Sequence, residues 1–314
     1  MVVAAARRRH DAAVDYAEAR SIFLTPRTAE RPPPQLPDTP ARRLRDAAEP
    51  IATISFWSRQ TNDRFAALGL DFLTGYVWAR AAALGEPAAS VVVAAFGVFE
   101  PGMVTALYQQ ARGTASRADV LAAREDGSVA ALAELLADAD VDPAVALLRR
   151  AVDALADDVA GRPLFAGLLS LPEPATPLGR LWHAVTLLRE YRGDVHVAAN
   201  VAAGLSGLQM NLMTEYWVGW EPTSYAATRG WSPEAMAAAD ADLVTRGLVA
   251  DGRLTAEGRR LREDVEARTE AALAPALDAV GPDLPELTRQ LDEWSAHVVA
   301  SGLAPTDPYK RASG

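Results

Sequence analysis

The chain has 314 residues, half of them hydrophobic, and a formal net charge of −10. It is long enough for one large domain or two smaller ones. The absence of cysteine excludes disulfides and thiolate chemistry, and an acidic surface disfavours polyanionic partners unless basic residues gather in one patch. No run of about 18 uncharged apolar residues occurs, and no signal-peptide core follows the N-terminus. We therefore expect a cytoplasmic protein that does not contact a membrane.

Residues 1–46 form a basic, proline-rich segment. They contain Arg7-Arg8-Arg9 and an arginine followed by three prolines at 31–34, and nine arginines face five acidic residues up to position 45. Such a composition cannot bury enough apolar surface to order itself, so we predict a disordered arm. The arm is either a solvated tail or a basic segment that touches nucleic acid or an acidic partner.

Residues 47–170 carry helical patterns almost throughout and are predicted to form a helical domain. Ser58 can cap a helix that Gly69 ends, and Pro101 begins another. Residues 88–98 fit either a buried helix or a strand. Three prolines between 172 and 177 mark a connector to residues 171–314, which we predict to be a winged-helix-like domain with C-terminal dimerisation helices. The connector is short, so we expect the two domains to fold as one cooperative unit.

Two helices are predicted directly after the connector. Thr176-Pro177 is a hydroxyl cap followed by proline at the first helical position, and it opens a helix over 178–191. Arg192-Gly193 ends that helix, and Asp194 caps a second one that runs from 195 towards 216. His196 then lies in the first turn, where the helix dipole disfavours its protonation.

The second of these helices has no charged side chain between residues 195 and 214. Its polar residues share one face: His196, Asn200, Gly207, Asn211 and Thr214. Three interpretations of this stripe stay open. It belongs to a packed core in which the polar groups hydrogen-bond to one another, it lines a ligand pocket, or it is exposed to solvent. Arg189 lies on the inward face of the preceding helix with Trp182, and a guanidinium there needs a carboxylate partner or an anionic ligand.

The pocket interpretation gives a definite set of site residues. The ligand-binding candidates are His196, Asn200, Asn211, Arg189, Trp182 and Thr214. An imidazole, two amides and a fixed cation in apolar surroundings suit a ligand that bears a carboxylate or an enolate. If the protein is an enzyme, the catalytic candidates are His196, Asp194 and Arg189. With four histidines and no cysteine we predict no metal site, and no glycine-rich phosphate loop indicates a cofactor.

Residues 243–258 contain the most specific pattern in the chain. Arg246-Gly-Leu-Val249 is followed by Asp251-Gly252-Arg253 and by a Leu-Thr-x-x-Gly motif that ends at Gly258. This passage resembles the wing of MarR-type winged-helix regulators. The resemblance implies a recognition helix over 232–247, a wing arginine at Arg253, and a homodimer formed by terminal helices. Hydrophobic residues recur every three or four positions near the C-terminus, and this seam suits packing on the preceding helix or on a dimer partner: Leu284, Leu287, Leu291, Trp294 and Val298.

The same region argues against DNA as the partner. Residues 232–270 contain six arginines and nine acidic residues, and the return strand of the wing is nearly absent. Arg259, Arg260 and Arg262 alternate with acidic residues, as on a solvated helix face. If DNA is bound, the candidates are Arg246 and Arg253. Nucleic acid binding is therefore expected to be weak. Besides these two arginines, the basic arm over residues 1–46 could contribute to it.

Residues 181–199 resemble the signature of an uncharacterised actinobacterial family of helix-turn-helix proteins. The resemblance implies a mainly α fold, with a helical N-terminal half and a degenerate MarR-like winged-helix C-terminal half. It supplies no reaction. Three functions therefore stay open: a small-molecule-binding regulatory or accessory protein of specialised metabolism with its pocket between the halves, an enzyme of specialised metabolism that works by acid–base chemistry, and a MarR-type DNA-binding repressor.

Overall fold

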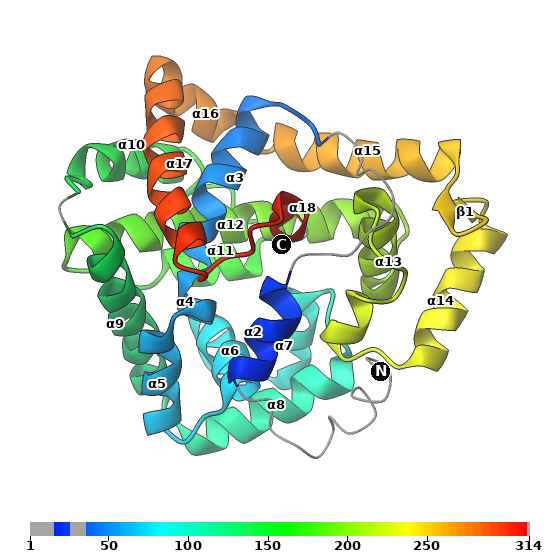
Figure 1. Cartoon of the computed structure of the whole chain (residues 1–314), viewed down its shortest axis with the longest axis horizontal. Helices are drawn as coiled ribbons and strands as arrows, with labels where there is room; N and C mark the ends of the chain where they lie inside the picture. The colour runs from blue at the N-terminus through cyan, green and yellow to red at the C-terminus, as the bar shows by residue number, and fades with distance from the viewer. Residues whose placement is uncertain (1–15, 26–35, 138, 313–314) are drawn as a thin grey trace.

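The structure is a computed structural model that describes residues 16–25, 36–137 and 139–312. These residues are almost entirely helical and contain a single two-stranded hairpin, so the prediction of a mainly α fold is confirmed (Figure 1). Residues 88–98, which fit either a helix or a strand, contain helix α7 (Ala89–Phe96). Within the described residues no single helix is both long and apolar enough to cross a membrane. One pair of consecutive helical segments, Phe72–Leu84 and Ala89–Phe96, is long and apolar enough when taken together, but the two are bent by 98° relative to each other.

The first part of the chain forms α2 (Tyr16–Leu24), α3 (Pro40–Ala52), α4 (Ile54–Trp57), α5 (Arg59–Ala67), α6 (Phe72–Ala81), η1 (Ala82–Leu84), α7 (Ala89–Phe96), α8 (Pro101–Thr114), α9 (Arg117–Leu135), α10 (Asp142–Asp153) and α11 (Pro163–Leu169). The second part forms α12 (Pro177–Ala202), α13 (Gly207–Val218), η2 (Ala226–Arg229), α14 (Pro233–Thr245), β1 (Val249–Ala250), β2 (Arg253–Leu254), α15 (Ala256–Ala271), α16 (Ala274–Val280), η3 (Gly281–Asp283), α17 (Leu284–Ala300) and α18 (Pro308–Ala312).

Helix α3 is a core element, which corrects the predicted boundary of the N-terminal arm at residue 46. Thr39 caps the helix by accepting a hydrogen bond from the amide of Arg42, and Pro40 occupies the first helical position. The helix then packs against α12 and α17, and its apolar residues are buried. The basic composition predicted a disordered arm, but two arginines of this segment point inward. Arg7-Arg8-Arg9 and residues 31–34 lie outside the described residues.

The largest hydrophobic cluster crosses the predicted domain boundary at residue 170. It joins α3, α9, α10 and α11 to α12, α16 and α17, and α12 runs through the middle of the molecule (Figure 1). A second cluster lies among α6, α7, α8 and α9, and a third among α13, α14 and the hairpin. Because α3 shares its core with helices from the far end of the chain, residues 47–170 and 171–314 do not have separate cores.

Helix α12 continues through Gly193 and Asp194, so the predicted helix break at these positions is wrong. A glycine inside a helix costs about 1 kcal/mol relative to alanine, which the buried residues on both sides of Gly193 offset. The true break comes later, where Gly204 adopts a positive φ of 72°. Ser206 and Gln209 then form a capping box that begins α13. The predicted polar stripe is consequently divided between two helices.

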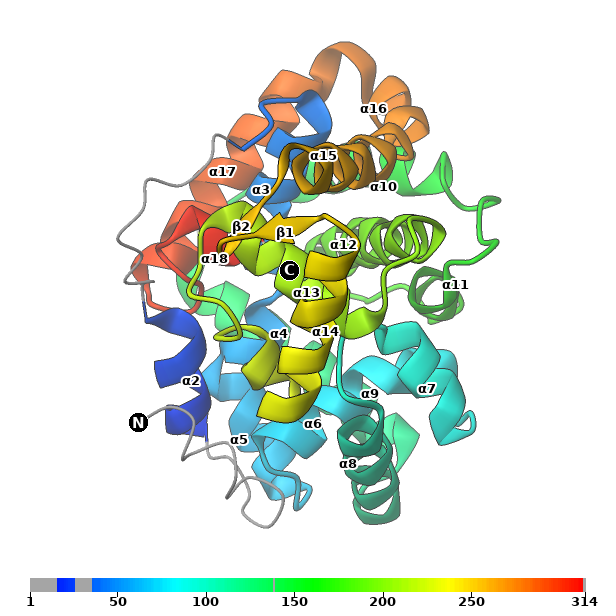
Figure 2. The ribbon, with the colours of Figure 1, turned by 90° about the vertical axis from the view of Figure 1, so that its right-hand side faces the viewer.

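Helices α13, α14 and α15 surround the hairpin and form a small unit at one end of the molecule (Figure 2). Strands β1 and β2 pair antiparallel over two residues each, and Asp251 and Gly252 both have positive φ in the turn. Gly258 lies against the hairpin so closely that a Cβ would come within 2.1 Å of the carbonyl oxygen of Leu248. The glycine of the Leu-Thr-x-x-Gly motif is therefore required by packing.

The hydrophobic seam of α17 packs inside the chain. Leu287, Leu291 and Val298 are fully buried, and α17 lies along α3, where the Ser295 hydroxyl donates to the carbonyl oxygen of Ala47. Of the two interpretations of this seam, packing within the chain is observed, on α3 and not on a dimer partner, because α3 covers the face that a partner would need. A homodimer stays a prediction that would have to use another surface.

Candidate functional site

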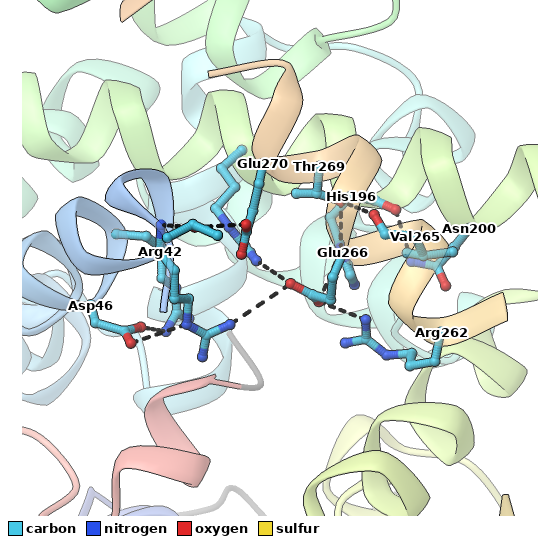
Figure 3. A network of polar contacts seen from close by, with 12 residues as sticks. Arg42, Asp46, His196, Asn200, Arg262, Val265, Glu266, Thr269 and Glu270 are labelled. Atoms are coloured by element: carbon cyan, nitrogen blue, oxygen red, sulfur yellow. Dashed lines mark hydrogen bonds and ion pairs between the residues drawn. The ribbon is translucent and has the colours of Figure 1, made fainter. Parts of the chain in front are cut away.

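Three buried arginines from three helices surround the carboxylate of Glu266 on α15 (Figure 3). Arg262, one turn earlier on α15, donates to it over 2.6 Å, and Arg192 of α12 donates over 3.0 Å. A nitrogen of Arg42, from α3, lies 3.7 Å away. The site therefore forms where α15, the helix that follows the hairpin, meets α3 and α12.

Arginines outnumber carboxylates in the ion-pair network that the described residues form at this site. Ion pairs join the site through Arg45 and Asp46 to a neighbouring cluster, and these pairs connect six arginines with four carboxylates, namely Arg42, Arg45, Arg80, Arg189, Arg192 and Arg262 with Asp46, Glu49, Glu190 and Glu266. The arginines hold the pKa of Glu266 well below its usual range despite its burial. Burial lowers the pKa of Arg192 to about 10, and repulsion from Arg45 and Arg42 adds to that effect although Glu266 opposes it.

Several donors of these buried arginines have no hydrogen-bond partner. Both terminal nitrogens of Arg42 and the Nε of Arg192 are inaccessible to solvent and bond to no acceptor among the described residues. Buried guanidinium groups usually have all their N–H groups satisfied, because an unsatisfied charged donor costs more than a neutral one. One carboxylate oxygen of Glu270, in the same network, is likewise buried without a hydrogen-bond partner in this part of the chain (Figure 3).

His196 lies at the edge of the same network. Its Nδ1 is 3.1 Å from the hydroxyl of Thr269, which itself donates to the carbonyl oxygen of Val265. The threonine hydroxyl can therefore only accept from the imidazole, so Nδ1 carries the proton and Nε2 is left as an acceptor. Burial lowers the pKa of His196 to about 3; Arg262 and Arg192 lower it further, and Glu266 opposes them. The expected neutral imidazole is present, although His196 does not lie in the first turn of its helix.

Arg189 has the carboxylate partners that its inward position requires. It lies 3.2 Å from Glu49 of α3 and 2.9 Å from Glu190, and Glu190 also binds Arg80 over 2.7 Å. These contacts tie α3, α6 and α12 together. Arg189 is thus fully engaged within the protein, away from His196.

Asp194 faces a different element from His196. Its carboxylate accepts the backbone N–H of Phe165 over 3.0 Å, so it caps α11 and not its own helix. Burial raises the pKa of Asp194 to about 7. Two residues along a helix turn the side chain by about 200°, which directs Asp194 and His196 to opposite sides of α12. The structure therefore does not bring the three catalytic candidates together.

The other ligand-binding candidates also occupy separate places. The Asn200 amide donates to the carbonyl oxygen of His196, and the Asn211 amide of α13 donates to Val98. Thr214 is buried on α13, and Trp182 lies under the guanidinium of Arg124, 5.1 Å from its ring centroid. Among the described residues, no three or more histidine or acidic side chains are arranged to hold a metal ion.

Comparison with known proteins gives one result, which covers most of the chain. A model described as "Helix-turn-helix family" matches residues 41–305. The chain belongs to this helix-turn-helix family. No curated protein and no solved structure matches it.

In this helix-turn-helix protein, α14 and the hairpin lie at the surface (Figure 2). Arg253 is exposed on β2, and Arg246 is exposed directly after the end of α14, where it donates to the carbonyl oxygen of Gly204 over 3.1 Å. Two acidic residues of α14 bind α13: Asp240 accepts from Tyr216 over 2.5 Å, and Asp242 from Gln209 over 2.6 Å. These contacts fix α14 on α13.

The residues around Glu266 were not among the predicted site residues. Arg262 was expected on a solvated face, but it is 2% exposed and covers the ring of Trp217 at 4.3 Å. Its alternation with acidic residues resembles that of any surface helix, so the sequence gives no signal of burial. Arg192 offers a weak signal, because it follows a long apolar block in α12 and has no charged neighbour of opposite sign at i+4.

Proposed function

We propose that the protein is a small-molecule-binding helix-turn-helix protein of a regulatory type, with a winged-helix-like C-terminal unit and weak DNA binding. Its ligand is an organic anion that binds where Glu266 meets Arg42, Arg192 and Arg262. The observation that carries this proposal is the presence of unsatisfied, buried guanidinium donors at that point. A carboxylate would supply both the missing acceptors and the missing negative charge.

The position of the site suits a regulatory role. Arg262 and Glu266 belong to α15, which leads directly out of the hairpin, while Arg42 and Arg192 belong to the body. An anion bound among these arginines would change how firmly α15 is held against α3 and α12. A ligand that binds one arrangement more tightly than another shifts the population towards it, which is the basis of a ligand-controlled switch.

Thermal melts of the full chain test the ligand site. Hexanoate, succinate and their uncharged amides would be added at matched ionic strength, and we expect the carboxylates alone to raise the melting temperature. Arg192→Met should remove this response while the fold persists, because Glu266 keeps two other arginines. Arg268→Met is the matched control, since Arg268 is an exposed residue of α15 that pairs with Asp264.

Two results would contradict the proposal. One is equal stabilisation by carboxylates and their amides, which would indicate a general solvent effect. The other is an Arg192→Met variant that responds as strongly as the parent, because the site would then lie elsewhere.

Weak DNA binding is inferred from the acidity of α14, which carries Glu234, Asp240 and Asp242 but no basic residue within its bounds. A recognition helix needs basic or amide side chains that reach bases and phosphates. We expect fluorescence anisotropy with generic duplex DNA at physiological salt to give dissociation constants of about 10⁻⁵ M or weaker. Substitution of Arg7, Arg8 and Arg9 by alanine should weaken what binding there is. Nanomolar, sequence-specific binding that depends on Arg253 would instead favour a repressor.

A further inference from the structure

A narrow cleft lies among α4, α5, α6 and α9, away from the Glu266 site. It has an empty volume of about 210 Å³, part of which opens to solvent. The lining combines a wall of aromatic rings with a few polar groups: Ser55, Phe56, Asn62, Phe65, Phe72, Tyr76, Ala79 and Arg124. The four helices that form it lie side by side in the lower part of Figure 1.

Arg124 is the unusual residue of this cleft. It comes from the middle of α9 and is 2% exposed, yet no carboxylate of the described residues lies within 4 Å of its guanidinium. The nearby Glu190 is bound by Arg80 and Arg189 instead. Burial lowers the pKa of Arg124 to about 10, and the charge of Glu190 only partly opposes that effect. A buried cation without an adjacent anion is costly, so its presence calls for an explanation.

The hydrogen bonds of Arg124 leave part of its edge unused. Its Nη1 donates to the carbonyl oxygen of Ala79 over a long 3.3 Å, and its flat face lies over the ring of Trp182. The Nε is buried and has no acceptor. The hydroxyl of Ser55, 1% exposed on α4, lines the same cleft and also has no partner. Two donors on opposite helices therefore share one cleft without an acceptor.

We propose that this cleft binds a small aromatic monocarboxylate. The carboxylate accepts from Arg124 and Ser55, and the ring lies among Phe56, Phe65 and Phe72. The negative charge matches the unpaired guanidinium, and the aromatic wall provides apolar contact and edge-to-face partners for a ring. The site is independent of the proposed ligand site at Glu266, because the two share no residue.

The cleft is too narrow in this conformation to admit a water molecule. A ligand of one ring with its carboxylate therefore fits only after the side chains that line the cleft move apart. Entry therefore requires the rings at its walls to turn. Tyr76 is the most exposed of the lining aromatics and stacks edge-on against Phe56 at 4.8 Å, so its rotation widens the cleft.

Benzoate is the probe for this site, and it would be titrated into the full chain by calorimetry and by ligand-detected NMR. Benzamide serves as the uncharged analogue and acetate as the analogue without a ring. We expect benzoate to bind at least tenfold more tightly than either, because only benzoate has both the charge and the ring. The Glu266 site is proposed to bind carboxylates as well, so the titrations are made in the Arg192→Met variant, in which only this cleft should bind benzoate.

Two variants test the roles of the polar groups. In the Arg192→Met background, Arg124→Met should abolish benzoate binding without lowering the melting temperature, since it removes a buried charge that has no ion-pair partner among the described residues. Ser55→Ala should weaken binding about tenfold through one lost hydrogen bond. Arg149→Met, which removes an exposed arginine paired with Glu173, is the control for loss of one positive charge and should bind as the parent does.

The proposal is overturned if benzoate and benzamide bind equally, or if Arg124→Met folds and retains the affinity of the parent. Should Arg124→Met fail to fold, Ser55→Ala decides the matter. Unchanged benzoate affinity in that variant would show that the ligand does not enter the cleft.

Discussion

Replacement of Glu266 by glutamine tests whether one carboxylate holds the centre of the molecule together. Glutamine keeps the shape of the side chain and removes its charge. Glu266 is 3% exposed, and arginine nitrogens lie 2.6, 3.0 and 3.7 Å from its oxygens. Removal of one partner from a buried ion pair costs about 3–5 kcal/mol, because the remaining charge is left uncompensated. For a chain of this length that corresponds to a fall in melting temperature of roughly 6–10 °C.

The assay is thermal unfolding followed by circular dichroism at pH 7, with urea unfolding as a second measure. Glu286→Gln is the matched control: its ion pair with Arg289 has a similar length of 2.7 Å, but both side chains are more than half exposed. That variant should melt within about 1 °C of the parent, because exposed pairs contribute little. Sulfate should also restore more stability to Glu266→Gln than chloride does at equal ionic strength, since the three arginines then lack their own anion.

A Glu266→Gln variant that melts within 2 °C of the parent would refute the reasoning. Such a result would mean that the guanidinium groups are neutralised or hydrated by other means. The surplus of positive charge, on which the proposed ligand site depends, would then not exist in solution.

Three further predictions concern pH, domain structure and packing. The pKa of His196 is lower in the folded state than the value of about 6.5 in the unfolded state, so its contribution to stability is complete above pH 6.5 and is lost as pH falls towards 3. Between pH 6.5 and 4, the free energy of unfolding in urea should therefore fall by about 3 kcal/mol less for His196→Asn than for the parent. Residues 171–314 expressed alone should aggregate, because α12 and α17 lose the cover of α3, and a monodisperse fragment with a cooperative melt would contradict this. Gly258→Ala should destabilise by about 1–3 kcal/mol through the clash with Leu248, whereas Gly113→Ala, in open space on a helix, should stabilise slightly in the same melts.

Local chemistry was well predicted from the sequence. The cap at Thr176 and Pro177, the Asp251-Gly252 turn and the helices on either side of the hairpin depend on residues within a few positions of one another. The Ser206–Gln209 capping box marks the true helix break, whereas the glycine at 193 lies inside a continuous helix. Glycine ends a helix only where the backbone needs a positive φ, and at 193 the continuous burial of α12 removes that need.

The arrangement of the buried charges was decided by tertiary structure alone. Arg42, Arg192 and Glu266 belong to three helices that are far apart in the chain, and Arg42 and Glu266 lie in segments whose composition is that of a solvated arm or surface. An isolated arginine pattern carries no information about burial, because a guanidinium is equally compatible with water and with a carboxylate that another helix supplies. Only the packing of α3 against α12 and α15 removes the water, and with it the screening that makes such charges unimportant at a surface.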